Sequence, residues 1–226
     1  NPGFLERFNR EARMLQQIQH PNIVPISDIG TLQGLPFFAM PLLPGGSLSA
    51  RRERDEKGKL LPNPPGMLHH WLPAMAAALD HLHAQGVVHR DVKPANIFFD
   101  AWWQALLGDF GVSKVVDETG GMEREETLTG TNMALGTEMY MAPEMWGRKP
   151  ISAGIDQYAL AVTVFELLAG RRPFEGETAH LAVEVSTKAP LLNTFRSDLP
   201  ASLVQAVNRA LAKRPEHRFS RDRKST

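Results

Sequence analysis

The chain has 226 residues, 42% of them hydrophobic, and its 25 lysines and arginines balance 25 aspartates and glutamates. This length fits one large domain or two small lobes, and the hydrophobic fraction excludes a disordered chain. The absence of cysteine excludes disulfides, thiol chemistry and cysteine-bound metal centres. A net charge of zero argues against a broadly basic protein, so we expect no nucleic-acid partner. No apolar run is long enough to cross a bilayer and no signal peptide is recognisable, so we expect no membrane contact within this chain.

The N-terminal part predicts a helix followed by two strands. Helical spacing over residues 4–19 places four side chains on one face: Phe8, Glu11, Leu15 and Ile18. A carboxylate on an apolar face is costly to bury alone, so Glu11 needs a cationic partner or a place at the edge of the stripe. Two apolar stretches then predict strands over residues 23–29 and 36–43, joined by a turn that contains Gly34.

The rest of the chain predicts helices around a long polar segment. Residues 51–66 are charged and then rich in proline and glycine, which is typical of a solvated, poorly ordered linker. Apolar spacing predicts helices over residues 68–82 and 201–211, and a helix that is apolar almost all round over residues 156–169. Residues 109–144 form a polar stretch of a length that is usually functional. This order of elements predicts an α+β fold with two unequal lobes.

Three short motifs carry the chemistry. The first runs from His89 to Asn96 as His-Arg-Asp-Val-Lys-Pro-Ala-Asn, with Asp91 as its third residue. Asp109-Phe110-Gly111 begins eighteen residues after Asp91, and Ala142-Pro143-Glu144 follows. The chance that these triplets and the spaced asparagine arise in this order is roughly one in ten million, so they are far more specific than any single short motif.

On these motifs the chain resembles the eukaryotic-like serine/threonine protein kinase family, from about residue 4 to about residue 220. Lys93, two residues after Asp91, is the serine/threonine pattern, and residues 156–161 are most similar to bacterial members. The resemblance implies a protein-kinase-like two-lobed α+β fold. It also implies ATP and Mg²⁺ as cofactors, with Mn²⁺ as an alternative metal, and transfer of the ATP γ-phosphate to serine or threonine hydroxyls of proteins. Autophosphorylation in trans is a further option.

The resemblance gives catalytic roles to four polar residues. Asp91 would accept or orient the proton of the substrate hydroxyl, and Lys93 would place a positive charge near the transferred phosphoryl group. Asn96 and Asp109 would be the metal ligands, because their hard oxygen atoms suit Mg²⁺ bound together with phosphate. Any one of these residues alone would be an ordinary polar loop residue. Phosphoryl transfer needs positioned charges more than covalent chemistry, so the set taken together predicts a catalytic site.

The same resemblance places the nucleotide, which Asp109 would also contact through the metal. Met40 falls at the gatekeeper position, and Pro41 and Leu43 fall in the hinge. Pro41 lacks an N–H group but can offer its carbonyl to adenine, and Leu43 would supply the N–H donor. Phe98 would form the apolar floor under adenine. Glu11 matches the helix residue that pairs with the lysine of the third strand, which would explain a carboxylate on an apolar face.

The resemblance also predicts regulatory residues, most of them in the polar segment 109–144. Arg90 next to Asp91 resembles kinases that are switched on when a phosphate in the activation segment pairs with arginine. The candidate phosphate acceptors are Thr127, Thr129 and Thr131. Thr137 matches a family threonine that forms a hydrogen bond near the catalytic aspartate, and we do not predict it as a phosphorylation site.

Three residues are predicted to be structural. Glu144 and Arg218 match a buried ion pair that ties the activation segment to the C-terminal lobe, and Asp156 matches an aspartate that anchors the catalytic loop. The predicted division is a partial N-lobe over residues 1–43, and a hinge exit and complete C-lobe over residues 44–226. Residues 109–144 form the activation segment of this single kinase domain.

Two family features are absent from the sequence. It contains no Gly-x-Gly, and its first lysine is Lys57, far beyond Glu11. The N-lobe would therefore consist of one helix and two strands. The expectations are a fragment with little activity of its own, indicated by the start on Asn1 without methionine, or a naturally shortened, non-catalytic pseudokinase or docking module. We expect a cytoplasmic location, with room for a membrane anchor outside this chain.

Overall fold

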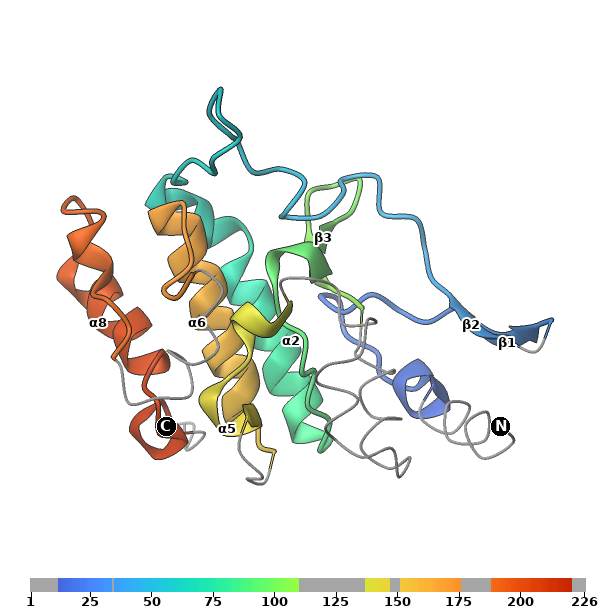
Figure 1. Ribbon diagram of the computed structural model, residues 1–226. Helices are drawn as coiled ribbons and strands as arrows, with labels where there is room; N and C mark the ends of the chain where they lie inside the picture. Colours follow the sequence, from blue (N-terminus) through green and yellow to red (C-terminus); the bar gives the residue numbers. More distant parts are fainter. Residues whose placement is uncertain (1–11, 34, 110–136, 147–150, 176–187, 221–226) are drawn as a thin grey trace.

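The computed structural model describes residues 12–33, 35–109, 137–146, 151–175 and 188–220 (Figure 1). Its strands are β1 (Asp28–Leu32), β2 (Leu35–Ala39), β3 (Ile97–Phe99) and β4 (Ala105–Leu107). Its α-helices are α2 (Leu72–Ala84), α5 (Pro143–Trp146), α6 (Gly154–Ala169) and α8 (Ala201–Ala210). Short 3-10 helices are η1 (Pro65–His70), η2 (Pro94–Asn96), η3 (Thr137–Tyr140), η4 (Leu192–Thr194) and η5 (Pro215–His217). The predicted α+β class with mainly helical C-terminal part is confirmed.

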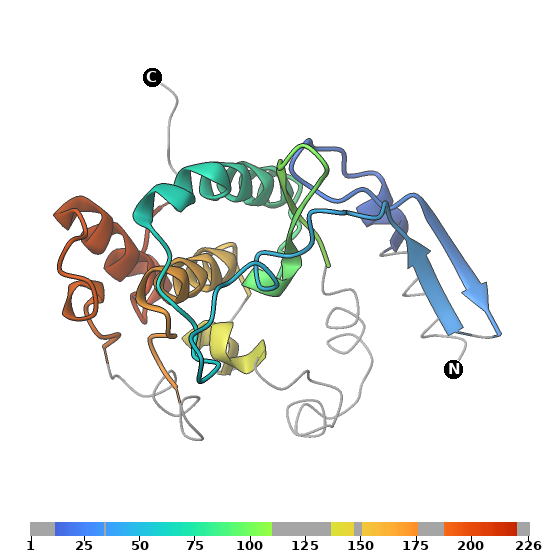
Figure 2. The same ribbon diagram turned by 90° about the horizontal axis from the view of Figure 1, so that it is seen from above.

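Helix α6 is the centre of the helical part. Figures 1 and 2 show it between α2 and α8. Most of its side chains are buried, as the apolar sequence predicts, whereas α8 buries only one face through Val204, Val207 and Ala210. Two carboxylates, Asp156 and Glu166, are nevertheless buried in α6. A buried charge needs partners, so these two residues mark where other segments attach to the helix.

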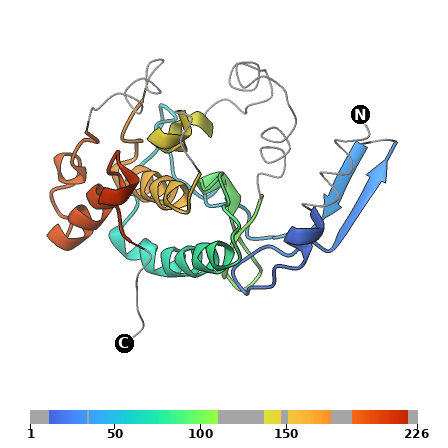
Figure 3. The same cartoon turned by 90° about the horizontal axis from the view of Figure 1, so that it is seen from below.

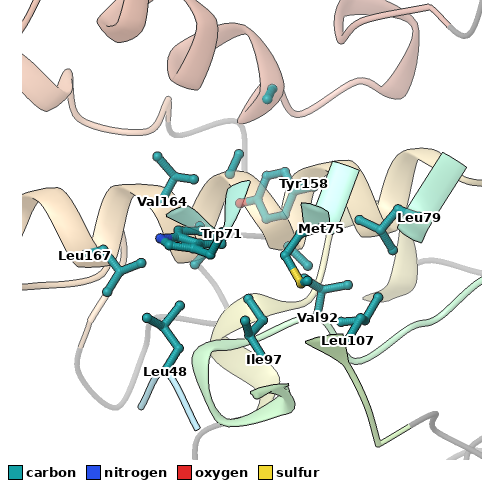
Figure 4. Packing of buried hydrophobic residues seen from close by; sticks show 14 of the residues in the cluster. Leu48, Trp71, Met75, Leu79, Val92, Ile97, Leu107, Tyr158, Val164 and Leu167 are labelled. Atoms are coloured by element: carbon teal, nitrogen blue, oxygen red, sulfur yellow. The ribbon is translucent and has the colours of Figure 1, made fainter. Parts of the chain in front are cut away.

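The main hydrophobic core joins α2, α6 and the β3–β4 pair (Figure 4). Trp71, directly before α2, and Tyr158 of α6 are almost completely buried, and Leu107 of β4 is buried as well. Burial of a large apolar side chain contributes roughly 1.5–3 kcal/mol, so this cluster holds the helices against the short strands. Those strands in turn flank the segments that contain the catalytic motifs.

Gly170 ends α6 in a left-handed conformation, with φ of 69°. A side chain at this position would be strained by the backbone and would also place its Cβ 2.7 Å from the carbonyl oxygen of Leu60. The glycine therefore lets the segment before α2 pass directly over the end of α6.

The prediction of a strand over residues 23–29 was wrong for residues 23–27, because β1 begins only at Asp28. Ile23 instead forms an isolated parallel bridge with Leu107 of β4. The Val24 amide donates to the Leu107 carbonyl at 2.9 Å, and the Leu107 amide donates to the Asn22 carbonyl at 2.8 Å. The apolar residues there pack on the C-terminal part rather than extending the hairpin. Residues 12–16 are helical, as predicted for that part of residues 4–19.

Strands β1 and β2 form an antiparallel hairpin that projects away from the helices (Figures 2 and 3). The second predicted strand ends at Ala39, so its expected last residues, including Met40 and Leu43, lie in the connection that follows. Among the described residues the hairpin pairs with no third strand. Leu32 and Leu35 are accordingly 68% and 72% exposed.

The prediction of a poorly ordered linker over residues 51–66 was also wrong. Many of its side chains face solvent, but the segment is fixed to α6 by Arg52, which binds Glu166, and by Asn63, whose amide donates to the Leu167 carbonyl at 2.7 Å. Its last residues form the start of η1. Within the described parts of the chain, no helix is long and apolar enough to cross a membrane.

Candidate active site

The motif around Asp91 lies in the loop between α2 and β3. Lys93 Nζ lies 2.9 Å from Asp91 Oδ2, and Asn96 Nδ2 donates to the same oxygen at 3.0 Å and to the Asp91 carbonyl at 2.9 Å. The side chains of Asp91 and Lys93 are only 11% and 16% exposed. The structure thus brings the three predicted catalytic residues together. A carboxylate held this way can accept a proton from a hydroxyl while the adjacent ammonium stabilises negative charge.

Asp156, at the start of α6, anchors this loop to the helix. Its carboxylate is completely buried. It accepts hydrogen bonds from the amides of His89 and Arg90, both at 2.8 Å, and from His83 Nε2 at 2.7 Å. Arg90 has a φ of 67°, a conformation that side-chain-bearing residues rarely adopt. Two amide bonds to one carboxylate stabilise this turn and so fix the direction in which Asp91 follows.

His89 connects the loop to the second motif. Its Nε2 lies 3.1 Å from the Gly108 carbonyl, and its Nδ1 accepts the Asp91 amide at 3.3 Å. Both contacts are satisfied by the neutral ring with its proton on Nε2. Burial lowers the pKa of His89, against the smaller opposite effect of Asp156 and Asp91. The neutral ring therefore spans from Asp91 to the residue before Asp109.

A backbone hydrogen bond brings the segments of the two expected metal ligands together. The Gly108 amide donates to the Asn96 carbonyl at 2.9 Å, which places Asp109 next to Asn96. Asp109 is exposed and has a φ of 57°. Since Asn96 Nδ2 is used on Asp91, its Oδ1 is the atom available to a cation. Two oxygen donors beside a phosphate site fit Mg²⁺, so the residues present are suited to this ion.

Neighbouring side chains pack so closely on Gly108 that they leave no room for a side chain there. A Cβ at this position would lie 2.9 Å from Val24 Cγ2 and 3.1 Å from two ring carbons of Phe98. Phe98, half-buried in β3, therefore lies directly beside the backbone that leads to Asp109. This position is compatible with the predicted apolar floor under a nucleotide.

The segment that follows the hinge residues runs alongside β3. The segment after β2 bridges to β3 between Ser47 and Phe98, and the Gly46 amide donates to the Leu43 carbonyl at 3.1 Å. Leu43 is half-buried, while Met40 and Pro41 are exposed. The structure therefore brings the hinge exit to Phe98 and leaves Met40 on the side of the projecting hairpin.

Several other predicted residues can be placed as well. Glu144 of α5 forms a buried ion pair with Arg218 at 2.7 Å, as the resemblance implied. Arg90 lies next to Asp91, and the backbone of Thr137 begins η3. The remaining predicted residues lie outside the described part of the chain: Glu11, Phe110, Thr127, Thr129 and Thr131.

Sequence reasoning missed four residues of this region. His83 binds Asp156, and Arg52 and Tyr140 both bind Glu166. One signal was present in the sequence, because Glu166 interrupts an otherwise apolar helix. The identity of its partners had no local signal.

The burial of His89 predicts a pH dependence of folding. In the unfolded chain this histidine titrates near 6.5, and in the folded chain its pKa is lower. The unfolded state then binds more protons below about pH 6.5, so the free energy of unfolding should fall as the pH drops from 6.5 towards the folded pKa, and be fully retained above 6.5. Urea unfolding between about pH 5 and about pH 8 measures this slope. The slope should be smaller in His89→Gln and unchanged in His69→Gln, an exposed control; equal slopes in all three would contradict the assignment.

Comparisons with known proteins agree with this geometry. The profile of the protein kinase domain family matches residues 2–224. Serine/threonine-protein kinase PknH of Mycobacterium tuberculosis is 35% identical over 222 residues, which cover 97% of this chain and 34% of PknH. Serine/threonine-protein kinase PrkC of Bacillus subtilis is 32% identical over 218 residues, or 96% of this chain and 32% of PrkC. The chain thus spans about a third of the length of the curated relatives it matches.

A solved structure supports the fold directly. The PknI kinase domain of Mycobacterium tuberculosis superimposes with a TM-score of 0.71 at 31% identity, covering 97% of this chain and 74% of that one. The sequence motifs, the arrangement around Asp91 and these matches lead to one conclusion. The chain belongs to the protein kinase domain family, in its bacterial, eukaryotic-like serine/threonine branch.

Proposed function

We propose that this chain is the greater part of a protein serine/threonine kinase domain, which transfers the γ-phosphate of ATP to serine or threonine hydroxyls of proteins. The observation that carries the proposal is the Asp91–Lys93–Asn96 cluster and its hydrogen-bonded connection to Gly108 and Asp109. A binding module without catalysis would need none of these groups in this arrangement.

The roles follow from the contacts. Asp91 receives or orients the hydroxyl proton of the substrate, and Lys93 stabilises the charge on the transferred phosphoryl group. Asn96 Oδ1 and the Asp109 carboxylate would hold Mg²⁺, which when bound neutralises phosphate charge. Phe98 and the hinge carbonyl and amide at Pro41 and Leu43 would hold adenine. Protein substrates are implied by the names of the relatives, and autophosphorylation in trans belongs to the proposal.

We also propose a domain division and a limit on activity. The partial N-lobe is residues 1–43, and the hinge exit and C-lobe are residues 44–226. The 226 residues contain no Gly-x-Gly and no lysine before Lys57. Without the lysine that contacts the phosphates, a charged hydrogen bond of about 1.5–3 kcal/mol is absent. The chain alone should therefore transfer phosphate slowly, and turnover equal to that of a complete kinase would contradict this.

The decisive test places the first three strands of a complete family member, including their Gly-rich loop and lysine, before Asn1. This chimera should phosphorylate a protein substrate in the presence of ATP and Mg²⁺. Asp91→Asn should lower its kcat by about 10²–10⁴-fold, because the proton acceptor is lost. Asp80→Asn, an exposed aspartate on α2, is the matched control and should leave kcat unchanged. Equal activity of both variants, or no activity in the chimera, would favour the alternative of a non-catalytic docking module.

A further inference from the structure

The turn between β3 and β4 contains two neighbouring tryptophans, Trp102 and Trp103, which are 81% and 63% exposed. Asp100 forms this turn, because its Oδ1 accepts the amides of Trp102 at 2.9 Å and of Gln104 at 2.8 Å. Trp103 has a φ of 67°, in the left-handed region that residues with a side chain rarely adopt. A tryptophan in a conformation that suits glycine is expected to have a compensating contact, and Arg51 provides one.

The guanidinium of Arg51 lies against two aromatic rings. Its central carbon is 3.7 Å from the centroid of the Trp103 ring and 5.1 Å from that of the Phe99 ring. The two rings are tilted to each other, with centroids 6.4 Å apart, and Phe99 is buried in β3. A guanidinium over an aromatic face is attracted by the negative charge of that face. Arg51 therefore joins an exposed ring of the turn to a buried ring of β3.

The same guanidinium also holds the segment that follows the hinge. Arg51 Nε donates to the Gly45 carbonyl at 2.6 Å. Gly45 lies so close to β3 that a Cβ there would be 2.5 Å from the Phe99 carbonyl oxygen. The Phe99 amide donates to the Gly46 carbonyl at 2.9 Å. The stacked arginine thus closes a loop of chain against β3.

This pairing sets the position of Phe98 relative to the hinge. Ser47 lies opposite Phe98 in an isolated antiparallel bridge, and the Gly46 amide donates to the Leu43 carbonyl at 3.1 Å. Figure 1 shows the segment after β2 passing beside β3. A displacement of residues 45–47 along β3 would therefore change the spacing between the expected adenine floor, Phe98, and the expected hinge donor, Leu43.

We propose that Arg51 and Trp103 are positioning residues for ATP. Their stacked side chains hold the segment after the hinge on β3, and so fix the spacing between Phe98 and Leu43. Both residues act through the backbone of β3 and of residues 45–47. This inference rests on the proposed kinase function, because it concerns the nucleotide side of that site.

The geometry predicts graded effects of conservative variants. A planar guanidinium can stack on a ring while its Nε donates to a carbonyl, whereas the ammonium of lysine keeps only the charge. Phenylalanine at position 103 keeps an aromatic face with a weaker attraction for a cation. Arg51→Lys and Trp103→Phe should therefore lie between the parent and the corresponding alanine variants in every measurement below.

The first arm of the test needs no activity. Amide hydrogen exchange is measured on the 226-residue chain for Arg51→Ala, Trp103→Ala and the matched control Trp102→Ala. The first two should speed exchange at the amides of Gly46 and Phe99 by about fivefold or more relative to amides of α8, and Trp102→Ala should not. Unchanged exchange at these amides, an equal rise in α8, or the same rise in the control would overturn the proposal.

The second arm uses the chimera with a complete N-lobe. Arg51→Ala and Trp103→Ala should each raise KM for ATP by about fivefold or more while kcat stays within about twofold, because the adenine site is altered and the reacting groups are not. Trp102→Ala should leave both constants within about twofold of the parent. Adding Trp103→Ala to Arg51→Ala should raise KM no further, because the stack is already lost.

The dissociation constant for ATP, measured on the same chimera variants without a protein substrate, separates the two claims. A parent chimera that transfers no phosphate would contradict the kinase function, and the order of the dissociation constants would then decide on the positioning role. Equal affinities for ATP in parent, Arg51→Ala and Trp103→Ala would overturn that role, as would a loss confined to kcat.

Discussion

Replacement of Arg218 with alanine should lower the free energy of unfolding by about 3–5 kcal/mol. The guanidinium is 1% exposed and the Glu144 carboxylate 3%. Its two terminal nitrogens each lie 2.7 Å from an oxygen of Glu144 and also donate to the carbonyls of Gly154 and Lys213, while Nε donates to the Ala212 carbonyl. All five donors are therefore used. Truncation would leave the Glu144 charge buried without a partner, which is the source of the large cost.

Urea unfolding measures this effect, and a surface ion pair provides the control. Arg171 and Glu175 are 3.1 Å apart but 44% and 37% exposed. Arg171→Ala should cost no more than about 1 kcal/mol. Replacing both Arg218 and Glu144 with methionine should recover much of the stability that Arg218→Ala loses, since no charge is then stranded. Similar losses at Arg218 and Arg171 would show that the buried pair contributes no more than a surface pair.

Asp156→Ala should have the second largest effect, a loss of about 3–5 kcal/mol, together with loss of phosphoryl transfer in the chimera. The change leaves the buried amides of His89 and Arg90 and the ring of His83 without their shared acceptor. Arg90 would then lose what stabilises its left-handed conformation, and Asp91 would lose its fixed direction.

The graded variant Asp156→Asn separates these contributions. It keeps the size of the side chain and one acceptor oxygen, so it should fall between the parent and Asp156→Ala in urea unfolding. Hydrogen exchange at residues 89–91 should rise in the same order. If Asp156→Ala unfolds at the same urea concentration as the parent, the carboxylate does not hold the loop.

The helices and the local cluster around Asp91 were the predictable part of this protein. Helix α6 is apolar on all sides and α8 on one side only, and each pattern predicted the burial that the structure shows. Asp91, Lys93 and Asn96 lie within six positions of one another, so their meeting in one loop needs no information from the rest of the chain.

The contacts that fix this loop were not predictable, because their partners are far apart in sequence. His83 and Asp156 are separated by 73 positions, and Arg52 and Glu166 by 114. Residues 51–59 are so rich in charge that their composition does not reveal which arginine is buried, here Arg52. The linker prediction failed for this reason.

The strand prediction at residues 23–29 failed through a competition between two partners. The apolar residues around Ile23 could extend the hairpin or pair with β4, and local pattern cannot distinguish these. In the structure Leu107 of β4 takes both backbone bonds. The segment thereby fastens the N-terminal part to the strand that leads into Gly108 and Asp109.

The left-handed backbone conformation of Asp109 lowers folding stability at a position whose side chain the proposed reaction needs. A φ of 57° suits glycine, and a residue with a side chain gives up about 1 kcal/mol there. Asp109→Gly should therefore raise the urea midpoint slightly while the chimera loses its metal-dependent transfer. An engineering campaign that ranked variants by thermal stability alone would select this substitution and thereby lose phosphoryl transfer. At position 109, a screen for stability should therefore favour glycine, whereas a screen for turnover should favour aspartate.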